Sequence, residues 1–187
     1  KAYQSYLRSS RKPILIGPWR SEVGFECLYN LPFLKWLLKG IDPSRLSVVT
    51  RGGAASLYGV PGVDLYDLRS VKTVRQENLY DAQKTGLQKQ MGVTSWDRDV
   101  MQEAAAQLLG RGAKYHLLHP SWMYWALEPF WMGKRGMAYL NGMTDYAPIP
   151  KVHTPPIDLP AKVVAKKWYT RPPFPPSEQV MGVVKDD

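Results

Sequence analysis

The segment Gly17–Glu26 is the first of three polar stretches whose residue types could support chemistry. It follows the apolar run Ile14–Ile16, and its leading glycine lets the backbone approach a ligand closely. Arg20 could clamp an anion through its planar guanidinium group, and the carboxylate of Glu22 or Glu26 could take a proton from a hydroxyl group. In the alternative, Glu22 interacts with a helix dipole and Arg20 is its surface partner. The functional interpretation makes Glu22 and Glu26 catalytic candidates and assigns substrate binding to Gly17, Trp19 and Arg20.

Arg51, Gly52 and Gly53 form the second stretch and follow another apolar run. Ligands of open α/β sheets bind at the carboxyl ends of strands, so we expect this turn to face the same cleft and to bind substrate. The alternative is a flexible turn with an exposed arginine. The G-x-G-x-x-G spacing of a dinucleotide fingerprint is missing from the sequence, and so is a P-loop motif.

His119 is the reactive group of the third stretch and lies at the end of a further apolar run. Its imidazole could act as an acid, a base or an anion donor, or it could simply bond to backbone. Trp122 follows in an aromatic-rich stretch and could stack on a ring of the substrate, whereas the alternative is a packed helix face. We expect His119 among the catalytic residues and Trp122 among the substrate-binding ones.

The sequence predicts no metal site and no cofactor. Strand alternation would direct His116 and His119 to opposite faces, which argues against a two-histidine site. The single cysteine, Cys27, excludes an internal disulfide framework, and its apolar neighbours indicate a small buried side chain rather than a nucleophile. No Ser-His-Asp or Cys-His motif indicates acyl transfer.

Apolar runs that alternate with amphipathic segments place these residues on a sheet. The expected strands are 14–16, 45–50, 63–66 and 114–119, and the expected helices are 25–37, 54–58, 96–109 and 122–127. Residues 71–84 are polar and only weakly helical. Pro32 either kinks the first helix or begins a second one, and Ser121 is expected to cap the last. This alternation predicts an α/β fold with a Rossmann-like, three-layer parallel sheet.

Prolines between residues 148 and 160 indicate an extended connector and a domain boundary. Residues 1–147 would then form the first domain, and 161–187 would form one strand and one helix beyond the linker. One strand and one helix cannot bury a core alone. They either pack onto the first domain or begin a truncated second domain.

The formal charge of +9 favours an anionic partner, which could be nucleic acid, anionic lipid or a phosphorylated small molecule. The cations are spread along the chain, so the case for nucleic acid is not strong. No apolar run approaches the roughly 20 residues that a membrane-spanning helix needs. We expect a cytoplasmic protein, with peripheral contact at the inner membrane face as an alternative.

Several stretches resemble bacterial glycosyltransferases of the GT-B type, which contain two Rossmann-like domains. They are Gly17–Glu26, Leu31–Leu34, Val49–Gly53 and Tyr169–Pro175. The resemblance implies that residues 1–147 are the acceptor-side domain, the N-terminal half of a GT-B-like architecture. Residues 161–187 would be the start of the donor-side domain, with Arg171 near the donor diphosphate. By this resemblance, most of the donor-side domain would be missing from the sequence.

By this resemblance, the chain transfers a sugar from a nucleotide-sugar donor to a glycan or another hydroxyl acceptor, without a bound metal. Glu22 or Glu26 would be the base, Arg20 would contact acceptor or phosphate, and Arg51 and His119 would line the same cleft. The expected partners are the donor, the acceptor, and a missing C-terminal domain or second chain. The chain alone could be inactive. The alternatives are a non-catalytic interaction or scaffold domain and a basic nucleic-acid-binding module.

Overall fold

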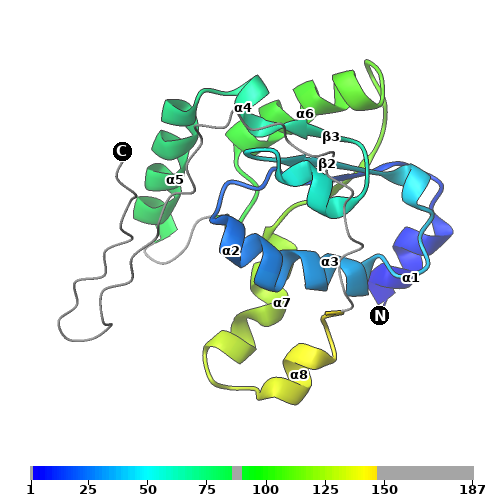
Figure 1. The fold of residues 1–187 in the computed structure, drawn as a ribbon, viewed down its shortest axis with the longest axis vertical. Coiled ribbons are helices and arrows are strands. Elements are labelled where there is room, and N and C mark those ends of the chain that lie inside the picture. Colours follow the sequence, from blue (N-terminus) through cyan, green and yellow to red (C-terminus); the bar gives the residue numbers. More distant parts are fainter. Residues whose placement is uncertain (1, 86–89, 147–187) are drawn as a thin grey trace, which may run out of the picture. The chain divides into compact units, whose positions relative to one another are not determined.

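Four short parallel strands form the centre of the fold (Figure 1). In chain order they are β1 (Ile14–Ile16), β2 (Leu46–Thr50), β3 (Gly62–Asp64) and β4 (His116–Leu118), and their order across the sheet is β3-β2-β1-β4. The computed structural model describes residues 2–85 and 90–146, and every element named below comes from these ranges. The three strand pairings in this part of the chain are parallel, which confirms the predicted α/β fold with a parallel sheet.

β1 is an internal strand and is buried on both faces. Ile14, Leu15 and Ile16 are each 4% exposed or less, and Ile14 pairs with Leu46 on one side and with His116 on the other. A continuous apolar run is typical of such a strand. The chain moves outward from β1 to β2 and β3 and then returns to β4 on the opposite side. The strand order therefore reverses between β1 and β4, and ligands of open α/β sheets bind at such a switch point.

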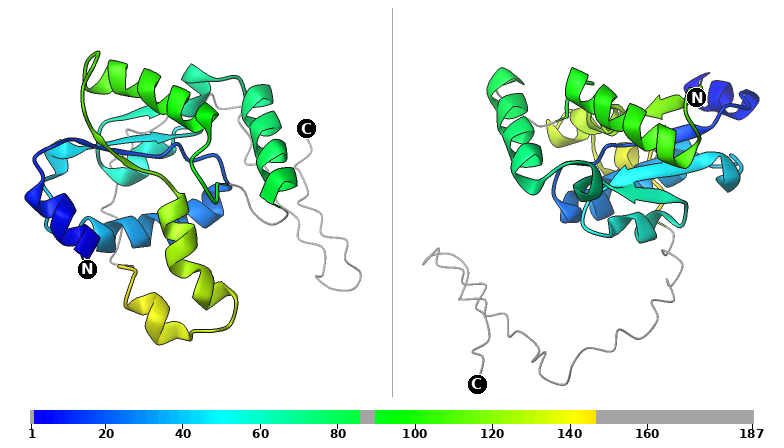
Figure 2. Two further views of the ribbon diagram at one scale, coloured as in Figure 1. Left: turned by 180° about the vertical axis from the view of Figure 1, so that it is seen from behind. Right: turned by 90° about the horizontal axis from the view of Figure 1, so that it is seen from above.

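Helices cover both faces of the sheet (Figure 2). The first face packs against α1 (Ala2–Ser9), α3 (Leu31–Leu37), α7 (Ser121–Trp131) and α8 (Met137–Asn141). The core of the second face contains residues of α4 (Leu65–Leu68), α5 (Val71–Thr85) and α6 (Ser95–Leu108). Alternation along β1 places Ile14 and Ile16 in the first core and Leu15 in the second.

The predicted helix over residues 25–37 consists of consecutive helical pieces. They are α2 (Val23–Phe25), a π-helical turn over Glu26–Asn30, and α3. The π-helical turn closes where the Leu31 N–H donates to the Glu26 carbonyl, one residue before Pro32. Pro32 lies in the first turn of α3, where a missing N–H is best tolerated. Of the two predicted roles for this proline, the start of a second helix therefore fits the structure better.

The polar segment 71–84 is more regular than its sequence predicts, because it lies within the 15-residue helix α5. Tertiary contacts account for the difference: Val74 packs in the second core, and Asp81 pairs with Arg20. The other predicted helices have close counterparts. The segment 54–58 is a 3-10 helix, η3 (Ala54–Tyr58), and a further 3-10 turn, η2 (Pro43–Arg45), precedes β2.

Two boundary predictions are wrong. The strand predicted over 63–66 ends at Asp64, because the Asp64 carboxylate accepts the Tyr66 N–H at 2.9 Å and so begins α4. Ser121 does not cap α7. Pro120 occupies the capping position, and the Ser121 Oγ instead lies 2.9 Å from Nδ1 of His119.

The predicted linker at 148–160 and the elements predicted over 161–187, with Arg171, lie outside the described residues. The chain divides into the units Lys1–Val152 and His153–Asp187, and all described residues belong to the first. Within the described ranges, no helix combines the length and the apolar character that crossing a membrane requires.

Gly17 holds the turn after β1 between two neighbouring strands. Its N–H donates to the Leu118 carbonyl at 3.0 Å, and the Trp19 N–H donates to the Val49 carbonyl at 2.9 Å. Its φ is +119°, and a Cβ at this position would overlap the Val49 carbonyl oxygen. Only glycine satisfies both the backbone angle and the close approach.

We predict that Gly17→Ala lowers the free energy of unfolding by about 3 kcal/mol, because it adds a steric overlap to an unfavourable φ. Gly110→Ala is the matched control, since Gly110 has a φ of +93° but open space around the Cβ position. The control should lose only about 1 kcal/mol. Urea unfolding measures both values, and equal losses would show that the overlap with Val49 does not matter.

Candidate functional site

Arg20 is buried at the carboxyl end of β1 and pairs with two carboxylates. Its Nη2 lies 2.7 Å from Oδ2 of Asp81, and its Nε lies 3.0 Å from Oδ1 of Asp97. The guanidinium group also donates from Nη1 to Oδ1 of Asn78 at 3.2 Å and lies 5.3 Å from the centre of the Trp96 ring. The sequence predicts that Arg20 binds an anionic ligand. In the structure its anionic partners are instead Asp81 and Asp97 of the chain itself.

His119 joins this cluster from the end of β4. Its Nε2 lies 3.3 Å from Oδ2 of Asp97, without the alignment of a hydrogen bond. The backbone N–H of Ser121 points to His119 Nδ1 at 3.1 Å, and because that group can only donate, Nδ1 must be the acceptor. The Nε2 edge of the ring faces Asp97. Through Asp97, the residues after β1 and β4 meet at the switch point of the sheet.

Asp97 is ionised in this cluster. Burial acts to raise the pKa of the Asp97 carboxyl, but the interactions with His119 and Arg20 and the Thr94 backbone hydrogen bond outweigh burial, so the pKa lies below its usual value. The cluster of Arg20, Asp81, Asp97 and His119 holds two carboxylates, one guanidinium and one imidazole. We call these four residues the buried charge cluster.

Gln90 ties the chain after α5 to the turn after β1. Its side chain accepts the Arg20 N–H at 3.0 Å and donates to the Pro18 carbonyl at 2.6 Å, and its own N–H donates to Asp81 at 3.0 Å. Gln90 adopts a φ of 64°, which is uncommon for a residue other than glycine. Its three hydrogen bonds compensate for this conformation and fix the position of Asp81.

A cavity of about 700 Å³ adjoins the buried charge cluster, and Asp81 belongs to both. We call it the α5–α7 cavity, because α5 and α7 supply most of its walls. Its aromatic lining residues are Tyr80, Trp96, Tyr124, Trp125 and Trp131. Its charged lining residues are Glu77, Asp81, Lys84 and Glu128. A large cavity with apolar walls and a few polar groups, next to a switch point, is the usual form of a small-molecule site.

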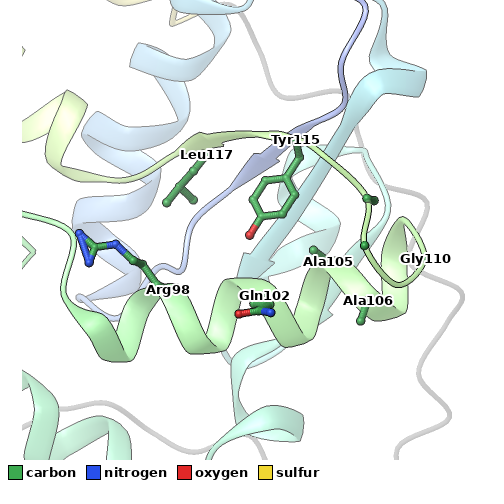
Figure 3. Close-up of a pocket in the computed structure, with 9 residues that line it drawn as sticks. Arg98, Gln102, Ala105, Ala106, Gly110, Tyr115 and Leu117 are labelled. Carbon is green, nitrogen blue, oxygen red and sulfur yellow. The ribbon is translucent and has the colours of Figure 1, made fainter.

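A smaller cavity of about 360 Å³ lies between α6 and the chain leading into β4. Figure 3 shows Tyr115 and Leu117 on one side of it and the α6 residues Arg98 and Gln102 on the other. Its described lining contains no carboxylate and none of the predicted site residues. The α5–α7 cavity is therefore the better candidate for a functional site.

The two predicted carboxylates lie in different surroundings. Glu26 is fully buried in the π-helical turn, and its Oε1 accepts hydrogen bonds from Thr50 Oγ1 at 2.6 Å and from the Tyr58 hydroxyl at 2.5 Å. Burial raises the pKa of Glu26, although these hydrogen bonds and the charge of Arg51 oppose the shift. Glu22 is exposed at the start of α2 and accepts a hydrogen bond from the neighbouring Ser21 hydroxyl at 2.8 Å.

A side-chain carboxylate of the chain itself binds the N–H groups of the glycine turn after β2. The N–H groups of Gly52 and Gly53 donate to the two carboxylate oxygens of Asp64 at 3.1 and 2.7 Å. Arg51 Nε donates to the Ser21 carbonyl at 2.6 Å, which joins this turn to the turn after β1. The two turns therefore lie together at one edge of the sheet.

The two predicted tryptophans do not line the α5–α7 cavity. Trp19 is 1% exposed and lies parallel to Tyr124 in the core, with ring centres 6.3 Å apart. Trp122 stacks on Tyr3 of α1, with ring centres 4.2 Å apart. Trp125, three residues after Trp122 and therefore on a neighbouring part of α7, lines the cavity instead.

Sequence analysis missed Asp81, Gln90 and Asp97. Asp97 had a local signal, because Thr94 and Asp97 have the spacing of a capping box and form one in the structure. Asp81 and Gln90 lie in stretches whose patterns give no indication of a buried position. Their roles depend on Arg20, which is distant in sequence.

No family model matches the chain, and neither a curated protein nor a solved structure matches it. Among the described residues, no three or more His, Cys, Asp or Glu side chains are grouped in a way that could hold a metal ion. The functional argument therefore depends on the geometry of the site.

We predict that Arg20→Met lowers the free energy of unfolding by about 3–5 kcal/mol, because it leaves two buried carboxylates without their cation. Arg69→Met is the control: Arg69 pairs with Glu103 at 2.6 Å, but both side chains are partly exposed. The control should lose less than about 1 kcal/mol. Similar losses in chemical denaturation would mean that the buried charge cluster is not a major source of stability.

Glu26→Gln should stabilise the protein at neutral pH. The pKa of the Glu26 carboxyl is raised in the folded state, so the folded protein binds more protons there than the unfolded protein does. The contribution of this carboxyl to stability therefore falls as pH rises from its usual pKa to its pKa in the folded state. Glutamine keeps an acceptor for Thr50 and Tyr58 and carries no charge. The variant should therefore melt at a higher temperature than the parent at about pH 7, and the gain should shrink towards about pH 4. A gain that does not change with pH would contradict this account.

Proposed function

We propose that this chain is the acceptor-side domain of a glycosyltransferase and that the α5–α7 cavity receives the acceptor sugar. One observation carries the proposal: aromatic rings and carboxylates line a large cavity beside the switch point of a parallel sheet. The resemblance of the turn segments to GT-B glycosyltransferases supports the same conclusion.

The walls of the α5–α7 cavity suit a sugar ring. Tyr80 on α5 and Trp125 on α7 are 56% and 59% exposed, so a ligand can reach them. The apolar face of a sugar stacks on such rings, while its hydroxyl groups donate hydrogen bonds to carboxylates such as Glu77 and Glu128. The Trp125 indole N–H donates to the Met91 carbonyl at 2.8 Å, which fixes the ring before a ligand binds. Such preorganisation lowers the entropic cost of binding.

Glu22 is the best of the three predicted catalytic residues for the role of base. Glu26 and His119 are 0% and 1% exposed, so neither touches a substrate in this conformation, whereas Glu22 is exposed. Burial raises the pKa of Tyr124, a hydrogen bond with Ser21 opposes the shift, and the charge of Glu22 adds to it. Glu22 is not among the described lining residues of the α5–α7 cavity, so this role requires an acceptor that extends beyond that lining.

The charge of the α5–α7 cavity argues against the nucleic-acid alternative. Three carboxylates and one lysine contribute to its described lining. Phosphate groups are attracted by clustered Lys and Arg side chains, and carboxylates would repel them. The donor diphosphate in this proposal would bind elsewhere, near Arg171, which lies outside the described residues.

The proposal predicts sugar transfer by the full chain from a nucleotide-sugar donor to a saccharide acceptor. Glu22→Gln should lower kcat by about 100-fold or more, since removal of a general base typically costs that much. Glu103→Gln removes an exposed carboxylate outside the cavity and is the control for charge. Equal activity of the parent and Glu22→Gln would exclude Glu22 as the base.

The same assay tests the α5–α7 cavity. Tyr80→Ala should raise the acceptor KM about tenfold through loss of stacking, whereas Leu79→Ala, which removes a 64% exposed side chain beside it on α5, should leave KM unchanged. For a chain that has no transfer activity on its own, calorimetry with free saccharides measures binding to the cavity directly. Absence of both transfer and saccharide binding would contradict the proposed function.

A further inference from the structure

The described lining of the α5–α7 cavity contains three carboxylates and one lysine, although the chain as a whole carries a charge of +9. Asp81 is neutralised by Arg20 at 2.7 Å, which leaves Glu77 and Glu128 against Lys84 among the described lining residues. Glu77 accepts a hydrogen bond from Thr94 at 3.1 Å, and this contact holds its carboxylate at the cavity wall. The side chains in contact with a ligand would therefore favour positive charge.

The buried charge cluster adjoins the α5–α7 cavity through Asp81, which belongs to both. The contact with Arg20 at 2.7 Å fixes the Asp81 carboxylate at the cavity wall. Because the pair is buried, water screens its charges less than it screens surface charges.

The aromatic rings of the α5–α7 cavity suit a cation as well as a sugar face. The negative face of an indole or phenol ring attracts an ammonium group within about 6 Å of its centre, and tryptophan is the strongest of these partners. Trp96 already has the Arg20 guanidinium 5.3 Å from its ring centre. Trp125 and Tyr80, both more than half exposed, offer further ring surfaces to a ligand.

An anionic ligand fits the α5–α7 cavity less well. The start of α6 lies at the cavity wall, and free N–H groups at a helix start attract anions. Here the capping box of Thr94 and Asp97 already uses some of these N–H groups. The Asp97 N–H donates to Thr94 Oγ1 at 3.1 Å, and the Thr94 N–H donates to Asp97 at 3.0 Å. The carboxylate of Asp97 also brings negative charge to the helix start.

From these observations we infer that the α5–α7 cavity recognises a ligand bearing an organic ammonium group, which the aromatic rings and the carboxylates of Glu77 and Glu128 surround. The inference rests on the proposed function, under which the ligand is an acceptor sugar with a free amino group. It adds a substrate class: an amino sugar should bind better than the same sugar with a hydroxyl or an acetylated amine at that position.

Isothermal titration calorimetry on the full chain tests this inference with three matched probes, glucosamine, glucose and N-acetylglucosamine, at equal ionic strength. Tetramethylammonium is a fourth probe that carries the cation without a sugar. Glucosamine should bind about tenfold more tightly than either neutral sugar. Glu128→Gln should reduce this preference, and Glu103→Gln, which alters a carboxylate of α6 outside the cavity lining, should preserve it.

The probes separate the inference from the proposed function. Equal affinity for the three sugars would overturn the inference and leave the acceptor site intact. Binding of tetramethylammonium without binding of any sugar would support ammonium recognition and contradict the proposed function. Failure of all four probes to bind, with a folded protein by circular dichroism, would overturn the inference. A preference for glucosamine that Glu128→Gln leaves unchanged would also overturn it.

Discussion

The pairing of Arg20 with Asp81 and Asp97 is the interaction on which the rest of the site depends. A charge enclosed in a protein interior is tolerated only when it is paired and hydrogen-bonded. Asp81 belongs to α5, Asp97 to α6, and Arg20 to the turn after β1, so this requirement fixes two helices against one strand end. His119 adds the end of β4. The positions of the cavity walls follow from this arrangement.

The same pairing links stability to function. The buried charge cluster holds the start of α6, where Trp96 lines the α5–α7 cavity, and fixes Asp81, which also lines it. Through Asp81 the cluster also brings a carboxylate to the cavity lining. A network that stabilises the fold can therefore also shape the ligand site.

The sequence predicts the strands well, because Ile14–Ile16 and Leu46–Thr50 are apolar runs with clear ends. It also proposes His119 as a catalytic residue and Arg20 as a contact for an external anion. The error has a physical cause: the carboxylates that bury Arg20 lie 61 and 77 residues away, and no local pattern reports such distant pairing. Charged residues are usually exposed, so local patterns alone place Arg20 at a surface.

The aromatic residues show the same limit of local patterns. The sequence indicates an aromatic stretch in α7, but the face that each ring occupies depends on where α1 and α5 pack. Trp122 therefore stacks on Tyr3, while Trp125 lines the α5–α7 cavity. The sequence offers Glu26 as a candidate base, but the burial of Glu26 depends on Thr50 and Tyr58, which tertiary structure brings to it.

Nitrogen-15 NMR of the tryptophan indole groups can show whether the α5–α7 cavity is the ligand site. Titration of the full chain with glucosamine should shift the indole signals of Trp96, Trp125 and Trp131, which line the cavity. The signals of Trp36 and Trp122, which lie outside its lining, should remain in place. Shifts confined to Trp36 and Trp122, or no shift at saturating ligand, would contradict the account.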